Sequence, residues 1–346
     1  MCCRKPPSRQ RGVVLIVVLI VVALVALIAT QISSRLLLSE RRSTNLQHSD
    51  QAWQYVLGAE SLAASHLKEA LKEDKDKVHL GQAWAKGKFV FPIEGGQLSG
   101  EIIDMSTCFN VNSLLFKKRD QQGNPSDPQG GKAGDTPNAM PAGAQLLSKI
   151  FEQTLEDVEV TPEALSSTLI DWIDEDNEPF GNDGAEDYQY TALQLPYRVG
   201  NGPLGAISEL RTIKGFDAEV YRAVRPFLCA LPDVEYGRIN MNTLPPERAV
   251  ILAAMVDNLS VESARQVLES RPKNGFDSEA DFWTAPGMPT DAKANKLGED
   301  RISFTTAYFL VKAEAVVGRG RARVESLLKA EENQSFKVVS RSFAEE

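Results

Sequence analysis

The chain has 346 residues, of which 42% are hydrophobic, and it carries a formal net charge of −9. Loss of the four basic residues that precede Val13 would bring the charge to about −13, which argues against a protein that binds nucleic acid through many phosphate contacts. The length is sufficient for an anchor segment and about two globular domains.

The N-terminus combines a short basic leader with a long apolar run. The leader, residues 1–12, ends in Gly12, and the twenty residues from Val13 to Ile32 carry no charge. A helix rises about 1.5 Å per residue, so the run can cross the hydrocarbon core of a bilayer. A secretory signal peptide usually has a shorter apolar region and an A-x-A cleavage motif, which this run lacks. The run therefore predicts a retained membrane anchor with its N-terminus in the cytoplasm.

Helical spacing continues beyond the apolar run. Residues 33–74 contain no proline and a single glycine, and their apolar residues recur at intervals of three and four. Together with residues 13–32 they predict one helix of about 60 residues, on the order of 90 Å long. An ordinary anchor has no need of a helix of this length.

This arrangement of leader, apolar half-helix and amphipathic half-helix resembles the type IV pilin-like prepilins. The resemblance implies that a prepilin peptidase cuts between Gly12 and Val13, and that the mature chain carries the family's methylation. Most pilins have a glutamate at the fifth mature position, which is Val17 in this chain. In its large size and its lack of this glutamate, the chain resembles the K-type minor pseudopilins of type II secretion systems. A buried carboxylate without its partner is costly, so an apolar residue suits a subunit that has no neighbour ahead of it.

Strand patterns occur on both sides of a long helical region. Residues 75–115 and 301–346 are predicted to form a pilin-like sheet domain, and residues 116–300 an inserted α-domain. Residues 117–143 are rich in Gly, Pro, Asp and Gln, which predicts a mobile surface loop. The expected fold is α+β, with the long N-terminal helix packed on an antiparallel sheet and a large helical insertion. The K-type resemblance implies the same arrangement.

A weak repeat relates FNVNSLL (109–115) to INMNTLP (239–245). The second copy opens a stretch that resembles the helix-hairpin-helix modules of DNA-uptake proteins. Those modules present backbone N–H groups to phosphate from a Gly-x-Gly hairpin, whereas residues 256–259 read VDNL and add a carboxylate. We predict a helix-hairpin-helix or SAM-like domain that does not bind nucleic acid.

Two cysteines remain after removal of the leader, Cys108 and Cys229. In an oxidising compartment they are able to form one disulfide. Two unpaired buried thiols are the alternative.

The densest chemistry lies in DWIDEDNEPFGNDGAEDYQY, residues 171–190, where eight of the first seventeen residues are acidic. Such a run is usually a solvated surface, but the aromatic residues between the acids favour packing against the core. Packed carboxylates repel one another unless a cation compensates, and oxygen ligands suit Ca²⁺. The segment also matches the calcium-binding region that the K-type resemblance implies. The candidate ligands are Asp174, Asp176, Glu186 and Asp187, with Asp171 and Asp183 as further candidates.

An enzyme is the competing class of function. The three histidines lie far along the chain from the acidic segment, and no nucleophile motif or Cys/His metal pattern is present. We therefore predict no catalytic residue.

The resemblance implies a non-catalytic subunit at the tip of the secretion pseudopilus that initiates or caps assembly and supports export across the outer membrane. Its body would lie in the periplasm, anchored in the bacterial inner membrane. The implied partners are the I- and J-type minor pseudopilins, the prepilin peptidase and the inner-membrane secretion platform. The helix face expected to contact partners consists of Trp53, Val56, Leu57, Leu67 and Leu71. The alternative function is that of a pilin-like helix-hairpin-helix protein in a DNA-uptake apparatus.

Overall fold

The computed structural model describes residues 11–74, 76–115, 139–156, 158–295, 297–298, 300–331 and 335–343. Most of the predicted leader and most of the predicted surface loop lie outside these residues. The chain groups into two compact units. The first contains residues 1–59, 90–99 and 314–323, and the second contains residues 60–89, 100–313 and 324–346.

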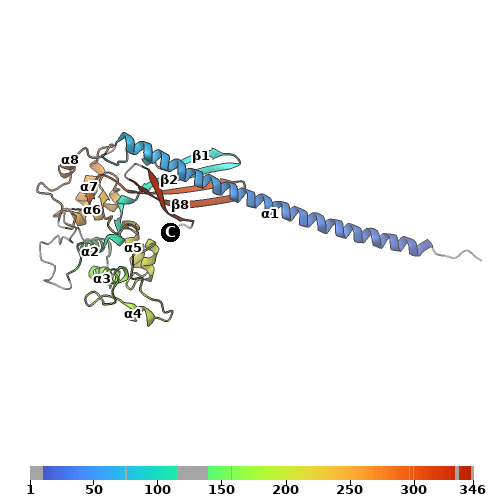
Figure 1. Ribbon diagram of the computed structural model, residues 1–346, viewed down its shortest axis with the longest axis horizontal. Coiled ribbons are helices and arrows are strands. Elements are labelled where there is room, and N and C mark those ends of the chain that lie inside the picture. Colours follow the sequence, from blue (N-terminus) through green and yellow to red (C-terminus); the bar gives the residue numbers. More distant parts are fainter. Residues whose placement is uncertain are drawn as a thin grey trace, which may run out of the picture. The chain divides into compact units, whose positions relative to one another are not determined.

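Helix α1 (Arg11–Glu73) runs for 63 residues without a break and is the long blue helix in Figure 1. The large hydrophobic side chains of residues 13–32 are all at least half exposed. Among the described residues, α1 is the one helix that is long and apolar enough to cross a membrane. These properties fit a single-pass membrane anchor.

The last part of α1 packs into a small core of the second unit. Ala63, Leu67 and Ala70 lie on one face of the helix, because residues three and four apart are neighbours on a helix surface. They share a buried cluster with Phe309 and Leu328 of the sheet.

The predicted partner face on α1 needs a correction at two positions. Val56 and Leu67 are both fully buried, with 0% of their surface exposed, because they face the protein's own core. Trp53, Leu57 and Leu71 are half-buried. Only these three keep side-chain surface that another protein can reach.

Five strands form the main sheet, in the order β1-β2-β7-β8-β9. Their bounds are β1 (Phe89–Ile93), β2 (Gly96–Asp104), β7 (Tyr308–Val317), β8 (Gly320–Ala330) and β9 (Phe336–Ser342). The cyan strands that precede the helical region thus lie beside the red strands that follow it (Figure 1). This arrangement confirms the predicted α+β fold with a helical insertion.

A β-bulge at the edge of the sheet links β9 to α1. Leu328 pairs with Val338 and Leu327 pairs with Ser340, so Val339 is the extra residue. A bulge of this kind shifts the alternation of side chains along the strand. Arg341 therefore turns toward α1 and donates from Nε and Nη2 to the buried carboxylate of Glu60, at 2.7 and 2.9 Å. These hydrogen bonds from Arg341 lower the pKa of Glu60.

The inserted region consists of short helices around one apolar core. The α-helices are α2 (Ala142–Thr154), α3 (Pro162–Ile173), α4 (Asp187–Thr191), α5 (Ala218–Val224), α6 (Ala249–Met255), α7 (Val261–Ser270) and α8 (Glu279–Trp283). Three short 3₁₀ turns precede this region: η1 (Ala83–Ala85), η2 (Met105–Thr107) and η3 (Val111–Ser113). Three more lie within it: η4 (Ile207–Thr212), η5 (Arg225–Phe227) and η6 (Pro246–Arg248). Helix α2 begins at Ala142, two residues inside the predicted loop 117–143.

The weak sequence repeat has a structural counterpart. β3 (Phe109–Asn110) pairs in parallel with β4 (Leu228–Cys229), and β5 (Ile239–Asn240) pairs in parallel with β6 (Ile302–Ser303). In each copy the first asparagine side chain accepts a hydrogen bond from the amide two residues later. Residues 109–115 contribute to the helical core, whereas the sequence pattern predicts that they belong to the sheet domain.

Cys108 and Cys229 form a disulfide beside the β3–β4 pair, with their Cα atoms 5.8 Å apart. The bridge closes a loop of 121 residues that includes α2 to α5. A cross-link of this span reduces the entropy of the unfolded chain, and a loop of 100 residues corresponds to about 4.7 kcal/mol at most.

We predict that the Cys108→Ser/Cys229→Ser protein loses about 2–5 kcal/mol in free energy of unfolding, measured by urea denaturation. The oxidised wild-type protein is the reference, and the wild-type protein under a reducing agent should match the variant. A variant as stable as the oxidised protein would show that the bridge does not stabilise the fold.

Candidate metal centre

The acidic segment begins at the C-terminal end of α3 and is positioned by a buried aspartate. Asp171, in the last turn of the helix, has 0% of its surface exposed. It accepts hydrogen bonds from the backbone N–H groups of Phe180, at 2.8 Å, and of Ala185. A Cβ atom at Gly184 would collide with the Asp171 carboxylate, so only glycine fits there. Asp171 thus folds the loop back onto α3, and it does not belong to the group of converging carboxylates described next.

Three other carboxylates converge in the folded loop. One oxygen from each of Asp174, Asp176 and Glu186 lies within 4.8 Å of the other two. Asp174 is the C-cap residue of α3, where the negative end of the helix dipole already disfavours anions. The local field and the three carboxylates all favour a cation at this point.

Buried oxygens without hydrogen-bond partners mark the same place. They are Asp174 Oδ1, both carboxylate oxygens of Glu186, Gln189 Oε1 and Asn201 Oδ1, for which the described residues supply no donor. An unsatisfied buried polar group costs about 1–3 kcal/mol, and more when it is charged. Native proteins rarely leave several such groups in one region. A ligand that accepts electron pairs from oxygen would satisfy these groups.

The electrostatics of the segment agree with this interpretation. Burial raises the pKa of Glu186 to about 7 and the pKa of Asp174 to about 6, and the charges of neighbouring carboxylates are the second cause. Burial also raises the pKa of Asp171. Without a cation, Glu186 and Asp174 hold their protons up to a pH at which isolated carboxylates are ionised.

Two of the predicted candidates lie outside the cluster. The Oδ1 atom of Asp187 accepts a hydrogen bond from Val199 N at 3.0 Å, and its Oδ2 atom lies 3.6 Å from Arg198 Nη1. Asp187 therefore closes the base of the following loop. Asp183 is exposed and does not belong to the group of converging oxygens.

Two amide side chains beside the cluster, those of Gln189 and Asn201, are not among the ligands predicted from the sequence. Asn201 Nδ2 donates to Asp176 O at 3.1 Å, and Gln189 Nε2 donates to Gly184 O at 3.4 Å, which leaves the amide oxygens available. Asn201 adopts a φ of 42°, a left-handed conformation that asparagine tolerates better than most residues. Its position between two glycines was the available sequence signal.

An aromatic cluster holds the two ends of the site together. Trp172 at the end of α3 contacts Tyr190 of α4 edge-to-face, with ring centroids 5.4 Å apart, and Tyr190 contacts Tyr197 at the same distance. Trp172 O accepts from Gly202 N at 3.3 Å. The residues before and after the acidic loop are therefore fixed near one another before any ion binds.

The donor set tests which metal the site would take. Three carboxylates and two amide oxygens provide only hard oxygen ligands, which suit Ca²⁺, whereas zinc sites use Cys and His. Asp174, Asp176 and Glu186, with Asn201 and Gln189 beside them, fit Ca²⁺ by this criterion.

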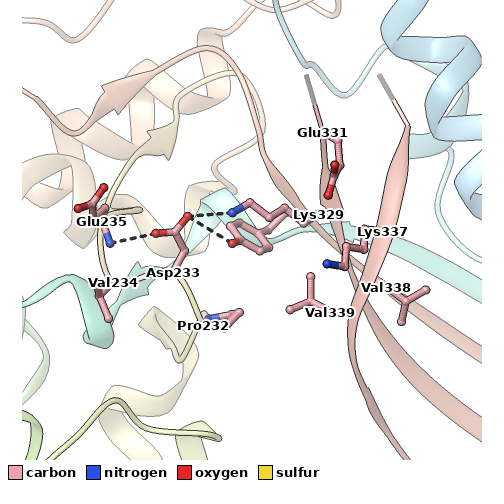
Figure 2. Close-up of a pocket in the computed structure, with 10 residues that line it drawn as sticks. Pro232, Asp233, Val234, Glu235, Lys329, Glu331, Lys337, Val338 and Val339 are labelled. Carbon is pink, nitrogen blue, oxygen red and sulfur yellow. Dashed lines mark hydrogen bonds and ion pairs between the residues drawn. The ribbon is translucent and has the colours of Figure 1, made fainter. Parts of the chain in front are cut away.

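A recess of about 630 Å³ between the loop 232–235 and strands β8 and β9 is a weaker candidate site (Figure 2). Its central carboxylate, Asp233, already accepts from Lys329 Nζ at 3.1 Å and from Glu235 N at 3.1 Å. The lining contains no histidine, cysteine or serine. The central acid of the recess is thus already paired, and the lining offers no serine, cysteine or histidine nucleophile.

Comparison with known proteins identifies the family. Residues 107–233 and 239–302 match two family models, both described as "Type II secretion system (T2SS), protein K". The two matches begin close to the two copies of the asparagine repeat.

Full-length relatives agree with the family models. The chain is 34% identical to the type II secretion system protein K of Aeromonas hydrophila, over 92% of each chain. It is 33% identical to that of Klebsiella pneumoniae, over 97% of each chain.

A solved structure shares the fold. The chain resembles a structure from the GspK-GspI-GspJ complex of the enterotoxigenic Escherichia coli type 2 secretion system, with a TM-score of 0.73 and 30% identity. The match covers 88% of this chain and all of the other. The resemblance predicted from sequence is confirmed, and the chain belongs to the type II secretion system protein K family of minor pseudopilins, structural components of the secretion machinery.

Proposed function

We propose that this chain is a non-catalytic tip subunit of the secretion pseudopilus, which initiates or caps assembly and so supports protein export across the outer membrane. The observation that carries the proposal is Val17, an apolar residue where most pilins have a glutamate. A subunit at the end of the filament has no neighbour ahead whose amine needs a carboxylate, and an unpaired buried carboxylate would be destabilising there.

The partners follow from the similar structure. That structure contains GspK together with GspI and GspJ, so we propose the I- and J-type minor pseudopilins as partners of this chain. The half-buried residues Trp53, Leu57 and Leu71 of α1 are the proposed contacts, since Val56 and Leu67 face inward. The prepilin peptidase and the inner-membrane secretion platform are further proposed partners, and the body is proposed to lie in the periplasm.

The DNA-uptake alternative has no support beyond the helical hairpin itself. Helices α6 and α7 are joined by residues 256–260, and Asn258 takes the left-handed conformation, with a φ of 59°. Asp257 is exposed in this hairpin and would repel phosphate. Membership of the protein K family favours the secretion function over this alternative.

We further propose that Ca²⁺ binds between Asp174, Asp176, Glu186, Asn201 and Gln189 as a structural ion. The ion would neutralise three carboxylates and satisfy the oxygens that lack donors. It would thereby join the end of α3, the start of α4 and the loop that contains Asn201. Its role here is to hold this part of the body in one conformation.

Calcium should therefore raise the melting temperature. Binding to the folded state alone adds about 2.7 kcal/mol when free calcium is a hundredfold above Kd, so a chelator should lower the melting temperature. Asp176→Ala should abolish most of this response without destabilising the chelated protein, because it relieves repulsion. Glu175→Ala, at the exposed neighbouring residue, is the matched control and should keep the response. A melting temperature that is unaffected by the chelator would contradict the proposal.

The chelated protein should lose stability as pH rises. The pKa of Glu186 goes from 4.5 to about 7 on folding, so between these values the folded state binds more protons than the unfolded state and stability falls with increasing pH. We expect the free energy of unfolding to decrease from pH 5 to pH 7.5 in chelator, and this decrease to be smaller in Glu186→Gln. An identical pH dependence in the variant would show that Glu186 is not responsible.

Cleavage of the leader by the prepilin peptidase is tested by replacing Gly12. We expect the mature protein to begin at Val13, and Gly12→Val to leave the precursor uncut because a branched side chain replaces a hydrogen at the cleaved bond. N-terminal sequencing of the membrane form distinguishes the two. A wild-type protein that begins at Met1 in membranes would refute the cleavage.

The tip position is tested by stoichiometry in sheared or purified pseudopili. The full chain should co-purify with the I- and J-type subunits and be present in far smaller amounts than the major subunit. Val17→Glu should give no gain in assembly. Regular spacing along the filament shaft, in amounts equal to the major subunit, would contradict a tip position.

A further inference from the structure

An exposed apolar loop follows the candidate metal centre. The eight consecutive residues 191–198, here called the tip loop, are all exposed. Leu193 has 47% of its surface exposed, Leu195 82% and Tyr197 38%. In Figure 1 this part of the chain, next to α4, runs along the periphery of the helical body. Soluble proteins seldom cluster large apolar side chains on the surface unless another molecule binds them.

The tip loop is held rigidly at its base. Asp187 accepts a hydrogen bond from Val199 N at 3.0 Å, so the two ends of the loop are joined. Tyr197 donates its hydroxyl to Thr212 O at 2.7 Å and lies against the ring of the buried Tyr190. A loop fixed in this way loses little conformational entropy when it binds. Leu193 and Leu195 are therefore exposed to solvent on a loop whose conformation is fixed at its base.

The charges near the base limit what can bind. The segment from which the loop arises carries exposed acids outside the candidate metal centre, at Glu175, Glu178 and Asp183. The basic side chain of the loop, Arg198, lies 3.6 Å from the carboxylate of Asp187. An acidic margin repels the anionic surface of a membrane and attracts lysine and arginine on a protein.

We propose that the tip loop docks into an apolar recess, bordered by lysine or arginine side chains, on a protein partner other than the I- and J-type pseudopilins. Leu193 and Leu195 enter the recess, and the acidic margin faces its basic border. The aspartate that closes the loop, Asp187, keeps the two leucines in the docking conformation. This role goes beyond assembly of the tip, because a chain with a defective loop still has the α1 face for its pseudopilin partners.

The test uses the full chain in cells that export protein, with a photo-crosslinking amino acid at Leu195. The same amino acid at Glu262, an exposed position on α7, is the control. We expect one protein adduct at Leu195 that is absent at Glu262, with the cross-linked site bordered by basic residues. Leu193→Ser should reduce the adduct roughly tenfold, since burying a leucine contributes about that factor. Asp183→Lys should reduce it, and Asp291→Lys, a charge reversal at another exposed aspartate, should not.

Several results would overturn the proposal. They are adducts with lipid, with a second copy of the chain or with I- or J-type subunits alone, and the absence of a specific adduct. Because Leu193 is half exposed, we expect Leu193→Ser to keep the melting temperature of the wild-type protein, and this measurement is the check on structure. Co-purification with the I- and J-type subunits should be unaffected by Leu193→Ser. If the wild-type chain did not co-purify with the I- and J-type subunits, the proposed tip assembly would be refuted instead.

Discussion

Convergence of three carboxylates at the end of α3 is the constraint on which the organisation of this part of the helical body depends. Asp174, Asp176 and Glu186 bring their oxygens within 4.8 Å of one another, at the negative end of α3. Burial, together with the charges of neighbouring carboxylates, raises the pKa values of Asp174 and Glu186, and oxygens of both lack hydrogen-bond donors. A divalent cation is the simplest means to reverse both effects. In the calcium-bound state that we propose, the loop from α3 to Asn201 would be a fixed support.

Several interactions of the fold are arranged so that this support stays in place. Asp171 folds the acidic loop, the Trp172–Tyr190–Tyr197 cluster joins its two ends, and Asp187 closes the loop that follows. At the other end of the chain, the bulge at Val339 lets Arg341 reach Glu60 and ties the last strand to the long helix. The end of α1, the last strand and the acidic loop thus depend on a few charged groups with defined partners.

The sequence predicted the architecture because the signals were long and periodic. The 63-residue helix, the strands on both sides of the insertion and the acidic loop all follow from spacing and composition. The failures concern single residues whose role depends on tertiary contacts. Helical spacing could not tell that Val56 and Leu67 face the protein's own core. An acidic composition could not separate Asp187, which binds a backbone amide, from Glu186, or reveal the amide oxygens of Gln189 and Asn201.

A crystal structure of the protein grown with calcium, compared with one grown in chelator, tests the central claim most directly. The account predicts one ion surrounded by oxygens of Asp174, Asp176 and Glu186 at about 2.3–2.6 Å, with Asn201 or Gln189 completing the shell. It also predicts that these carboxylates separate or become disordered in chelator. Saturating calcium with no ion at this position, and the three carboxylates held instead by protein donors, would contradict it.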